Sequence, residues 1–427
     1  MKKKILYVVA LVALAALCLG LLVSCNNSTA NFFEYSEKDI GLIGRLVALM
    51  HGWIGNYGWT VVVFTVFLMI LTMPLEFWQR YSSRKSTLKM QRIQPLLEAI
   101  DKRYGANTQR ANEEKQKLYK KQGYSMASMC LPMIVTLVIF FLMFGGLRNY
   151  SSYSSIKLFR ELSEVYHETY VEQILDNDDI KSQILSNEKY NEHYAQYQDA
   201  LEAQDAKSLL NAQTNLIDDA RKVDAQACNT YQDGALEAVK SYYEEHHESW
   251  LWIQNVWQPD TWAPIMQPYN GNTFLGGSFE NSINMDGYPG SHKEIYNLIR
   301  NAVLETGGYG NNGTWNGLMI MPVLSIGLSF LSMFISQRQE KKNRKGEAVQ
   351  LNQQQAATNK TMLIVMPLMM AYFGFIYTGA FAIYMVVSST IRIFSTLAMR
   401  IPVEKAVLKK LDKDEDKNKS SKASYMR

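Results

Sequence analysis

Two long apolar segments separated by a strongly basic connection constrain this chain more than any other feature of its sequence. Residues 57–78 and 129–147 are each close to the roughly 20 residues with which a helix crosses the hydrocarbon core of a bilayer. The connection, residues 79–128, is rich in Lys and Arg and poor in acidic residues. Such connections are typical of loops that face the cytoplasm. The pattern therefore predicts two membrane spans joined on the cytoplasmic side.

Whole-chain averages hide this pattern, because a net charge of +4 and 20% charged residues would suit a soluble protein. Four further apolar runs occur along the chain, at residues 5–24, 316–336, 361–377 and 379–398. Long core helices of a soluble protein are the alternative interpretation, but runs this long and uncharged do not usually recur so often. We therefore expect an all-α polytopic membrane protein.

The first apolar run differs from the others and is typical of a lipoprotein signal peptide. Three lysines precede it, and it ends in a lipobox-like sequence, Leu22-Val23-Ser24-Cys25. We expect residues 1–24 to be removed and Cys25 to become the mature N-terminus, diacylated with chains such as palmitate. An uncleaved membrane span is the alternative. The other cysteines are too scattered to imply a disulfide framework.

The charges of the remaining connections indicate one orientation. If Cys25 is exported, the span at 57–78 runs from outside to inside, and outer and inner segments alternate from there. Residues 148–315 then lie outside, whereas the basic segments 337–360 and 399–427 lie in the cytoplasm. We expect a protein of the bacterial plasma membrane, lipid-anchored outside at its N-terminus and with a cytoplasmic C-terminus.

Residue patterning divides the rest of the chain into segments. Residues 25–56 predict a polar tether and a short helix that either lies on the outer membrane face or packs against the bundle. Residues 79–128 predict a cytoplasmic helical hairpin, for which a plain solvated connector is the alternative. Residues 148–249 predict an acidic helical insertion outside the membrane, and residues 250–315 a Trp/Gly-rich outer loop.

Aromatic and turn residues refine two of these boundaries. Trp250, Trp252, Trp257 and Trp262 precede the third span and predict a belt of tryptophans at the outer membrane interface. The turn at residues 377–379 is so short that the last two spans must form an antiparallel pair.

No enzyme signature is present, since the sequence has no zinc-protease HExxH motif, no phosphate-binding glycine loop and no nucleophile elbow. We therefore expect no enzymatic activity, no cofactor and no metal. His246, His247 and Glu248 are the closest approach to a metal site. Adjacent residues on a helix point in different directions, so a solvated surface is the favoured interpretation.

Arg392 is the most informative polar residue inside a predicted span. An ionised side chain near the bilayer centre costs about 2.5–3.5 kcal/mol on insertion scales, so such residues are usually retained for a function. The alternative is that Arg392 extends its long side chain to the inner membrane surface. Hydroxyl residues of the spans would either join it in a polar cavity or simply bond within their own helices. They are Thr65, Thr72, Thr136, Ser325, Ser329 and Ser332.

A set of short motifs occurs in a specific order across residues 40–150 and 250–400. The motifs are Gly58-Trp59-Thr60-Val61, Met73-Pro74-Leu75, Ile93-Gln94-Pro95, Leu118-Tyr119-Lys120, Leu131-Pro132 and Trp252-Ile253, followed by Tyr384 and Ser388. Together they resemble the YidC membrane protein insertases, and the lipobox resembles the Gram-positive, lipoprotein type. The resemblance implies five core spans and a cytoplasmic hairpin that receives client proteins. It also implies a hydrophilic groove open to the cytoplasm and to lipid but closed outside.

The sequence departs from this family pattern at two places. Members typically carry a groove arginine five residues before the proline that matches Pro74, and this position is Met69 here. We hypothesise that Arg392 supplies the missing charge from the last span. The second departure is the extracellular helical insertion, whose role the family does not supply. The candidate groove and client-binding residues are Thr65, Met69, Thr72, Tyr384, Ser388 and Arg392.

The resemblance predicts an insertase and chaperone that moves short polar segments of nascent membrane proteins across the bilayer. A wet groove shortens the apolar path for the polar segment, while the apolar segment of the client leaves sideways into lipid without nucleotide. Further expected partners are the Sec translocon, the ribosome, through ribosomal RNA bound by the basic tail 405–427, and anionic lipids. A tail that merely keeps the protein soluble is the alternative, and no DNA partner is expected.

Two other functions remain open from the sequence. A small-molecule or lipid transporter should have inverted repeats and broken helices, and neither is evident. A lipid-anchored receptor would bind a ligand through its acidic outer domain, and it should lose all activity when residues 151–249 are deleted.

Overall fold

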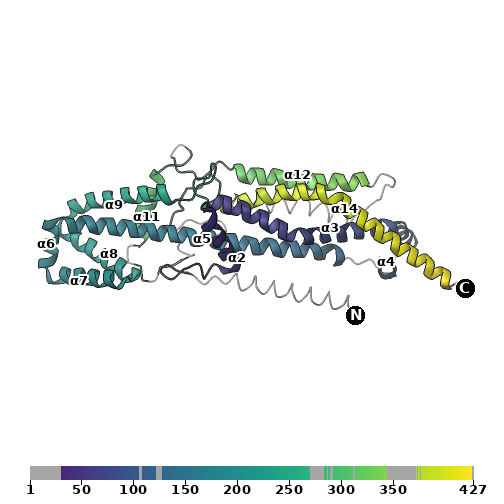
Figure 1. Ribbon diagram of the computed structural model, residues 1–427, viewed down its shortest axis with the longest axis horizontal. Helices are drawn as coiled ribbons and strands as arrows, with labels where there is room; N and C mark the ends of the chain where they lie inside the picture. The colour runs from purple at the N-terminus through teal and green to yellow at the C-terminus, as the bar shows by residue number, and fades with distance from the viewer. Residues whose placement is uncertain are drawn as a thin grey trace.

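The computed structural model describes residues 30–104, 108–121, 127–269, 283–285, 287–288, 292–310, 313–343, 372, 374–375 and 377–425. The predicted signal peptide, Cys25, most of the inner loop 337–360 and most of the fourth predicted span lie outside these residues. The described residues form an elongated molecule that is almost entirely helical (Figure 1). The all-α fold class is confirmed at this level, whereas the count of five spans stays a prediction.

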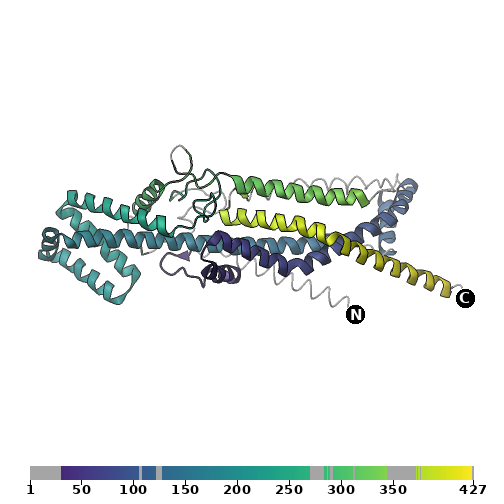
Figure 2. The same cartoon turned by 45° about the horizontal axis from the view of Figure 1, so that its top comes forward.

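One half of the molecule contains the apolar helices, which lie side by side along its length in both views (Figures 1 and 2). These helices and their connections are α2 (Gly41–Ile54), α3 (Tyr57–Tyr104), α4 (Thr108–Lys121), the first part of α5 (Ala127–Asp176), α12 (Ile320–Asn343) and α14 (Gly379–Tyr425). Within the described residues, two of them contain stretches long and apolar enough to cross a membrane, Tyr57–Ser86 in α3 and Gly379–Lys410 in α14.

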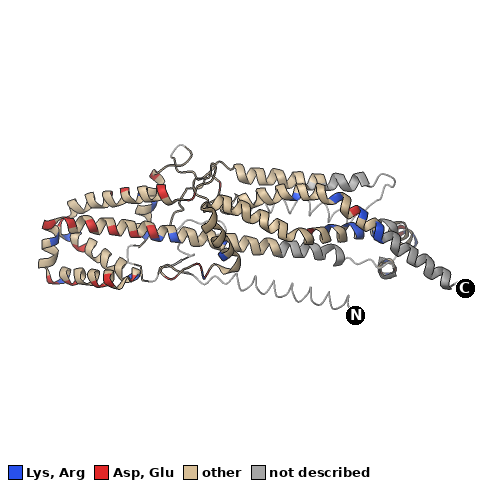
Figure 3. Ribbon diagram, viewed as in Figure 1, with Lys and Arg blue, Asp and Glu red and all other residues tan. Residues whose placement is uncertain are grey.

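The other half is a separate helical unit. It contains the distal part of α5 together with α6 (Asp178–Ser186), α7 (Glu188–Ala203), α8 (Ala206–Val223), α9 (Ala225–His246) and α11 (His292–Glu305). Two short strands, β1 (Ala30–Asn31) and β2 (Ile283–Asn284), pair in parallel beside it. Acidic residues gather on this half, whereas the apolar helices carry few charges until Lys and Arg appear near their far ends (Figure 3).

Capping residues explain where the helices of this unit begin. Asn177, Asn187, Asp205 and Asp224 have extended backbones, and the side chain of each accepts hydrogen bonds from N–H groups of the following turn. These groups have no partner inside a helix, so the caps satisfy them and separate four consecutive helices sharply.

The helical unit has its own hydrophobic core. Phe159 of α5, Leu216 of α8, Val239 of α9 and Ile299 of α11 are buried together in it. Phe32, which follows β1, is buried among them, and its carbonyl oxygen accepts a hydrogen bond from the guanidinium of Arg160. The unit therefore draws on chain segments before and after residues 148–249, including part of the predicted outer loop.

His167 is fully buried in this unit. Its Nδ1 atom lies 2.7 Å from the carbonyl oxygen of Ser163, to which it donates, and Nε2 has no partner among the described residues. Burial lowers the pKa of His167 to about 4, because the charged imidazolium would lose its hydration there. The side chain is therefore neutral at physiological pH.

Helix α5 is continuous over 50 residues and joins the two halves. It contains the predicted second span and the beginning of the predicted insertion. Helix α2 packs across it at Gly146, where an added Cβ atom would lie 2.2 Å from Cγ2 of Ile43. The opposite face of α2 exposes Leu42 and Trp53, so α2 packs against the bundle and leaves an apolar face exposed, while its contact with the membrane surface stays a prediction.

The prediction that four tryptophans form a belt at the membrane interface is wrong for two of them. Trp250 and Trp257 are buried in the core that the apolar helices share, and the ring of Trp257 lies 4.2 Å from that of Tyr57. Trp252 is partly buried, and only Trp262, 60% exposed, is free to reach an interface. Buried tryptophans reach this core because Gly58 leaves room for Trp250 against α3.

Candidate functional site

Helices α3 and α14 form the seam on which most of the predicted groove residues lie. They run in the same direction, since both begin at the loop of residues 248–260 and continue toward the same end of the molecule (Figure 1). Near that end Arg84 of α3 pairs with Glu404 of α14 at 3.1 Å. This register places Arg392 about level with Thr72, roughly one helical turn beyond Met69.

The hydroxyl groups predicted to line the groove bond within their own helices. Thr65 is fully buried, and its Oγ1 donates to the carbonyl oxygen of Val61 at 2.6 Å. Ser388 is also buried, and its Oγ donates to the carbonyl oxygen of Met385 at 3.2 Å. These bonds satisfy the donors and leave the oxygen lone pairs as acceptors.

The other candidate residues differ in burial. Thr72 is partly buried and donates to the carbonyl oxygen of Leu68 at 2.9 Å, and Met69 is partly buried beside it. Tyr384 is buried in the core between the apolar helices.

The remaining polar residues of the spans lie mainly on α12. Ser329 of α12 lies 3.4 Å from Ser389 of α14, oxygen to oxygen, and links these helices. Ser325 bonds within α12, Ser332 is partly buried, and the side chain of Thr136 lies outside the described part of the chain.

A cluster of charged side chains occupies the α3–α14 seam near the Arg84–Glu404 pair, at the end far from the loop of residues 248–260. The Nη2 atom of Arg80 donates to Oγ of Ser395 at 3.1 Å and lies 3.8 Å from Oε2 of Glu76. Ser395 in turn donates to Glu76 at 3.2 Å. Arg392 lies within electrostatic range of Arg80 and of Tyr384. The sequence prediction singled out Arg392 but missed Glu76, Arg80 and Ser395, which lie where the span meets the basic connection.

The loop of residues 248–260 holds the first turns of three apolar helices. At α3, the Glu248 carboxylate accepts from the N–H of Tyr57 at 3.1 Å through Oε2. At α14, the N–H of Gly379 donates to the carbonyl oxygen of Gln258 at 2.7 Å. At α12, Asp260 accepts from the N–H of Met321 at 2.8 Å. Helix starts carry unpaired N–H groups and a partial positive charge, so these acceptors fix all three starts at one level.

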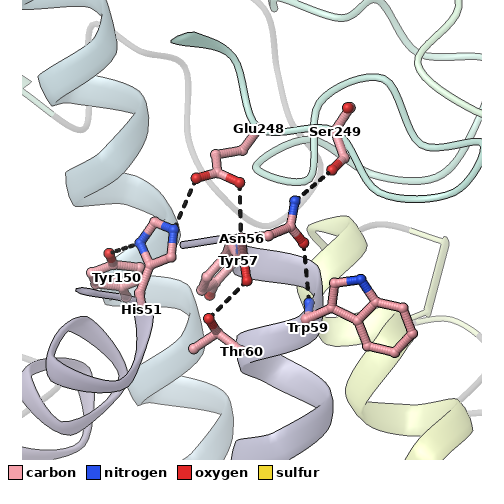
Figure 4. A network of polar contacts seen from close by, with 8 residues as sticks. All are labelled: His51, Asn56, Tyr57, Trp59, Thr60, Tyr150, Glu248 and Ser249. Carbon is pink, nitrogen blue, oxygen red and sulfur yellow. Dashed lines mark hydrogen bonds and ion pairs between the residues drawn. The ribbon is translucent and has the colours of Figure 1, made fainter. Parts of the chain in front are cut away.

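Glu248 also joins the short helix α2 to this arrangement (Figure 4). Its Oε1 atom lies 2.8 Å from Nε2 of His51, and Nδ1 of His51 lies 2.7 Å from the hydroxyl of Tyr150 on α5. Asn56 completes the network by donating to the carbonyl oxygen of Ser249 at 3.1 Å. The network connects α2, α3, α5 and the loop at a single point.

The expectation that residues 246–248 form a solvated surface is wrong for Glu248. His246 is exposed, and its ring stacks 3.9 Å from that of Tyr242. Glu248, in contrast, is partly buried and bonded as described above. Within the described residues no group of His, Cys, Asp and Glu side chains is arranged to hold a metal ion.

Asp260 is fully buried and has three donors. Besides Met321, its carboxylate accepts from the N–H of Leu318 at 3.0 Å and from Nε1 of Trp252 at 3.1 Å. Gly317 lies so close that an added Cβ atom would be 2.0 Å from Oδ1. The sequence analysis did not single out Asp260. The signal that marks it is a lone aspartate within a Trp/Pro-rich stretch, residues 250–268.

Comparison with known protein families shows to which family the chain belongs. The family described as "60Kd inner membrane protein" matches residues 49–198 and 234–406, which include α3, α5, α12 and α14 as far as residue 406. The chain belongs to this family. The match runs through both predicted departures of the sequence, since it covers Met69 and residues 148–198 and 234–249 of the helical insertion.

Individual relatives of this family bear the name membrane protein insertase YidC. That of Caldanaerobacter subterraneus subsp. tengcongensis is 38% identical over 113 residues, which are 26% of this chain and 53% of the relative. That of Nitratidesulfovibrio vulgaris is 32% identical over 104 residues, 24% of this chain and 19% of the relative. That of Treponema denticola is 31% identical over 144 residues, 30% of this chain and 24% of the relative. The matched segments thus span about half or less of these relatives.

Proposed function

We propose that this protein is a membrane protein insertase and chaperone of the bacterial plasma membrane. In this function, polar segments of nascent membrane proteins enter along the α3–α14 seam, and apolar segments leave sideways into lipid. The observation that carries the proposal is the asymmetry of the seam. One end is held shut by the loop of residues 248–260, and polar and charged side chains occupy the other. The relatives named membrane protein insertase YidC support the same function.

The proposed orientation puts the loop of residues 248–260 outside and the charged cluster inside. It is supported by the charge distribution, since acidic residues gather beyond the loop and Lys and Arg beyond the cluster (Figure 3). In this orientation α3, α12 and α14 all cross from outside to inside, as the five-span arrangement requires. The cytoplasmic hairpin, made by the end of α3 with α4, would receive the clients.

The physical task is to reduce the cost of polar groups in hydrocarbon. A buried polar group without a hydrogen-bond partner costs several kcal/mol, so a client segment needs acceptors and charge along its path. The lone pairs of Thr65 and Ser388 and, nearer the cytoplasmic side, the charge of Arg392 would supply them along the seam. We propose that Arg392 replaces the charge absent at Met69, which its level on the seam supports.

Site-specific photo-crosslinking to a stalled single-span nascent chain tests the groove. A crosslinker placed singly at Thr65, Tyr384 or Arg392 should form adducts with the client. The matched control is Leu185 on α6, which is exposed but lies in the helical unit far from the seam and should form none. If all three seam positions stay without adducts while the client is inserted normally, the groove is elsewhere.

A separate experiment tests whether Arg392 replaces the charge absent at Met69. Arg392→Ala should reduce insertion of a client with an acidic polar segment, whereas Arg392→Lys should retain most of it. If Arg392→Ala inserts clients as well as the unmodified protein while Thr65→Ala does not, the charge has not moved to Arg392.

Lipid attachment at Cys25 and the Sec translocon, ribosome and lipid partners remain proposals as well. Metabolic labelling with palmitate should mark the unmodified protein and not the Cys25→Ala variant. Ribosome binding should fall when the basic tail 405–427 is removed, if that tail contacts ribosomal RNA.

A further inference from the structure

Three residues expected to contact clients are covered in this structure. Thr65 is fully buried, Ser388 is 3% exposed and Tyr384 is 5% exposed. All three lie on the seam between α3 and α14, and buried side chains do not touch a client while the two helices stay packed together. Contact with a client therefore requires α3 and α14 to separate at one end of the seam.

The end of the seam at the loop of residues 248–260 is held through the backbone of both helices. The N–H of Tyr57, at the start of α3, donates to the carboxylate of Glu248. The N–H of Gly379, at the start of α14, donates to the carbonyl oxygen of Gln258 at 2.7 Å. Separation at this end would leave these donors without partners, and an unsatisfied buried donor is costly.

The opposite end of the seam is held by side-chain contacts, which we call the clasp. Arg84 and Glu404 pair at 3.1 Å, and their side chains are 17% and 34% exposed. Beside this pair, Val407 is fully buried against Tyr81 and Leu88. Partly exposed ion pairs contribute little to stability, so the helices separate here at lower cost than at the loop. The clasp comprises Glu76, Arg80, Arg84, Ser395, Glu404 and Val407.

Each of the two helices contains a proline beside the clasp. Pro74 of α3 precedes Glu76 by two residues, and Pro402 of α14 precedes Glu404 by two residues. Because proline has no N–H group, one hydrogen bond of the helix is missing at each position, and helices bend most readily at such points. The segments that carry the Arg84–Glu404 pair can therefore move while the rest of each helix keeps its place.

We propose that the clasp is a gate at the cytoplasmic end of the seam, closed in this structure, which opens to expose Thr65, Tyr384 and Ser388. The loop of residues 248–260 is then the fixed end from which α3 and α14 diverge. This inference rests on the proposed function and deepens it, because it identifies the contacts that break before a client enters. The alternative is a permanent clasp that holds the two helices together while clients bind elsewhere.

Cysteine labelling measures opening of the clasp without any insertion assay. Inverted membrane vesicles present the cytoplasmic face to a membrane-impermeant maleimide, and Ser388→Cys in a Cys130→Ala background provides a covered target. Glu404→Gln should raise the labelling rate about fivefold, the shift in an opening equilibrium that accompanies loss of one partly exposed ion pair. Exchange of the charges, Arg84→Glu with Glu404→Arg, should return the rate to its original value.

Two further variants locate the end that opens. Lys409→Gln removes an exposed charge from the same helix outside the clasp and should leave the labelling rate unchanged. Glu248→Ala weakens the opposite end of the seam. The proposal is overturned if Glu404→Gln has no effect from the cytoplasmic face while Glu248→Ala speeds labelling from the outer face.

A reversible lock separates the gate from the insertase function. Arg84→Cys and Glu404→Cys, introduced together, can be joined by a bifunctional thiosulfonate whose links are cleaved by reduction. The joined protein should insert no client, and reduction should restore insertion. Insertion by the joined protein would overturn the gate and leave the proposed function intact. A protein that inserts no client before joining or after reduction would refute the proposed function, and the labelling rates would still decide whether the clasp opens.

Discussion

The buried carboxylate of Asp260 allows a quantitative test of how the start of α12 is held. Its two oxygens accept three hydrogen bonds, from Leu318, Met321 and Trp252, at 2.8–3.1 Å. Hydrogen bonds to a charged group contribute about 1.5–3 kcal/mol each, and an unsatisfied buried donor costs about 1–3 kcal/mol. Asp260→Asn keeps one acceptor oxygen, loses the charge and turns an NH2 group toward a donor. We expect it to lower the free energy of unfolding by about 3–4 kcal/mol.

Two measurements check this value. Titration with a denaturing detergent in mixed micelles, followed by tryptophan fluorescence, gives the free energy of unfolding. Hydrogen exchange of the peptide containing Leu318 and Met321 reports the local loss, because those two amides bond directly to the carboxylate. Asp233→Asn, an exposed change on α9, is the matched control and should be neutral within about 0.5 kcal/mol.

The reasoning fails if Asp260→Asn is as stable as the unmodified protein and leaves exchange at Leu318 unaltered. Gly317→Ala provides a second approach to the same contact, since its added Cβ atom would lie 2.0 Å from Oδ1 of Asp260. Gly317→Ala should also lower the free energy of unfolding, because it disturbs the same contact while the carboxylate itself is kept.

Three further predictions concern packing, capping and pH. Gly58→Ala should destabilise by about 1–3 kcal/mol, because its Cβ would lie 2.1 Å from Cγ of Trp250, whereas Gly52→Ala in open space should not; the same detergent titration compares them. Glu248→Ala should cost about 2 kcal/mol through the lost helix cap, and faster amide exchange at the start of α3 should accompany it. Because the pKa of His167 is lowered to about 4, this residue contributes stability above pH 6.5 that is lost as the pH falls toward 4. Thermal unfolding should therefore occur at lower temperature in acid, and His167→Phe should make this pH dependence smaller.

Sequence reasoning succeeded where long-range pattern decides the structure. Apolar runs of bilayer length predicted the helices α3 and α14, because burial in lipid and backbone hydrogen bonding both demand a helix there. The ordered motifs predicted the family, which the match over residues 49–198 and 234–406 confirms. Thr65 and Tyr384 lie on the seam helices as expected, but their role in binding clients remains a prediction.

The same reasoning failed where a residue's role depends on a neighbour distant in sequence. Trp250 and Trp257 were predicted to lie at the membrane interface because tryptophan is common at interfaces. Only the contacts of Trp250 with Gly58 and of Trp257 with Tyr57 show that both are buried. Glu248 read as solvated because its partner His51 is 197 residues away. Contacts between residues so distant in sequence leave no local sequence pattern, so they could not be predicted from a single sequence.

The continuity of helix α5 limits how the helical unit can move relative to the apolar helices. Because one unbroken helix carries both the second predicted span and the first helix of the unit, the two cannot rotate independently. The part from Arg148 to Asp176 is about 43 Å long at 1.5 Å per residue, so tilting the span by about 10° displaces its tip by roughly 8 Å. In the proposed orientation, small adjustments of the span within the bilayer would thereby be amplified into large displacements outside it. A distance probe placed near Asp176 would act as a gauge of span tilt that never touches the membrane.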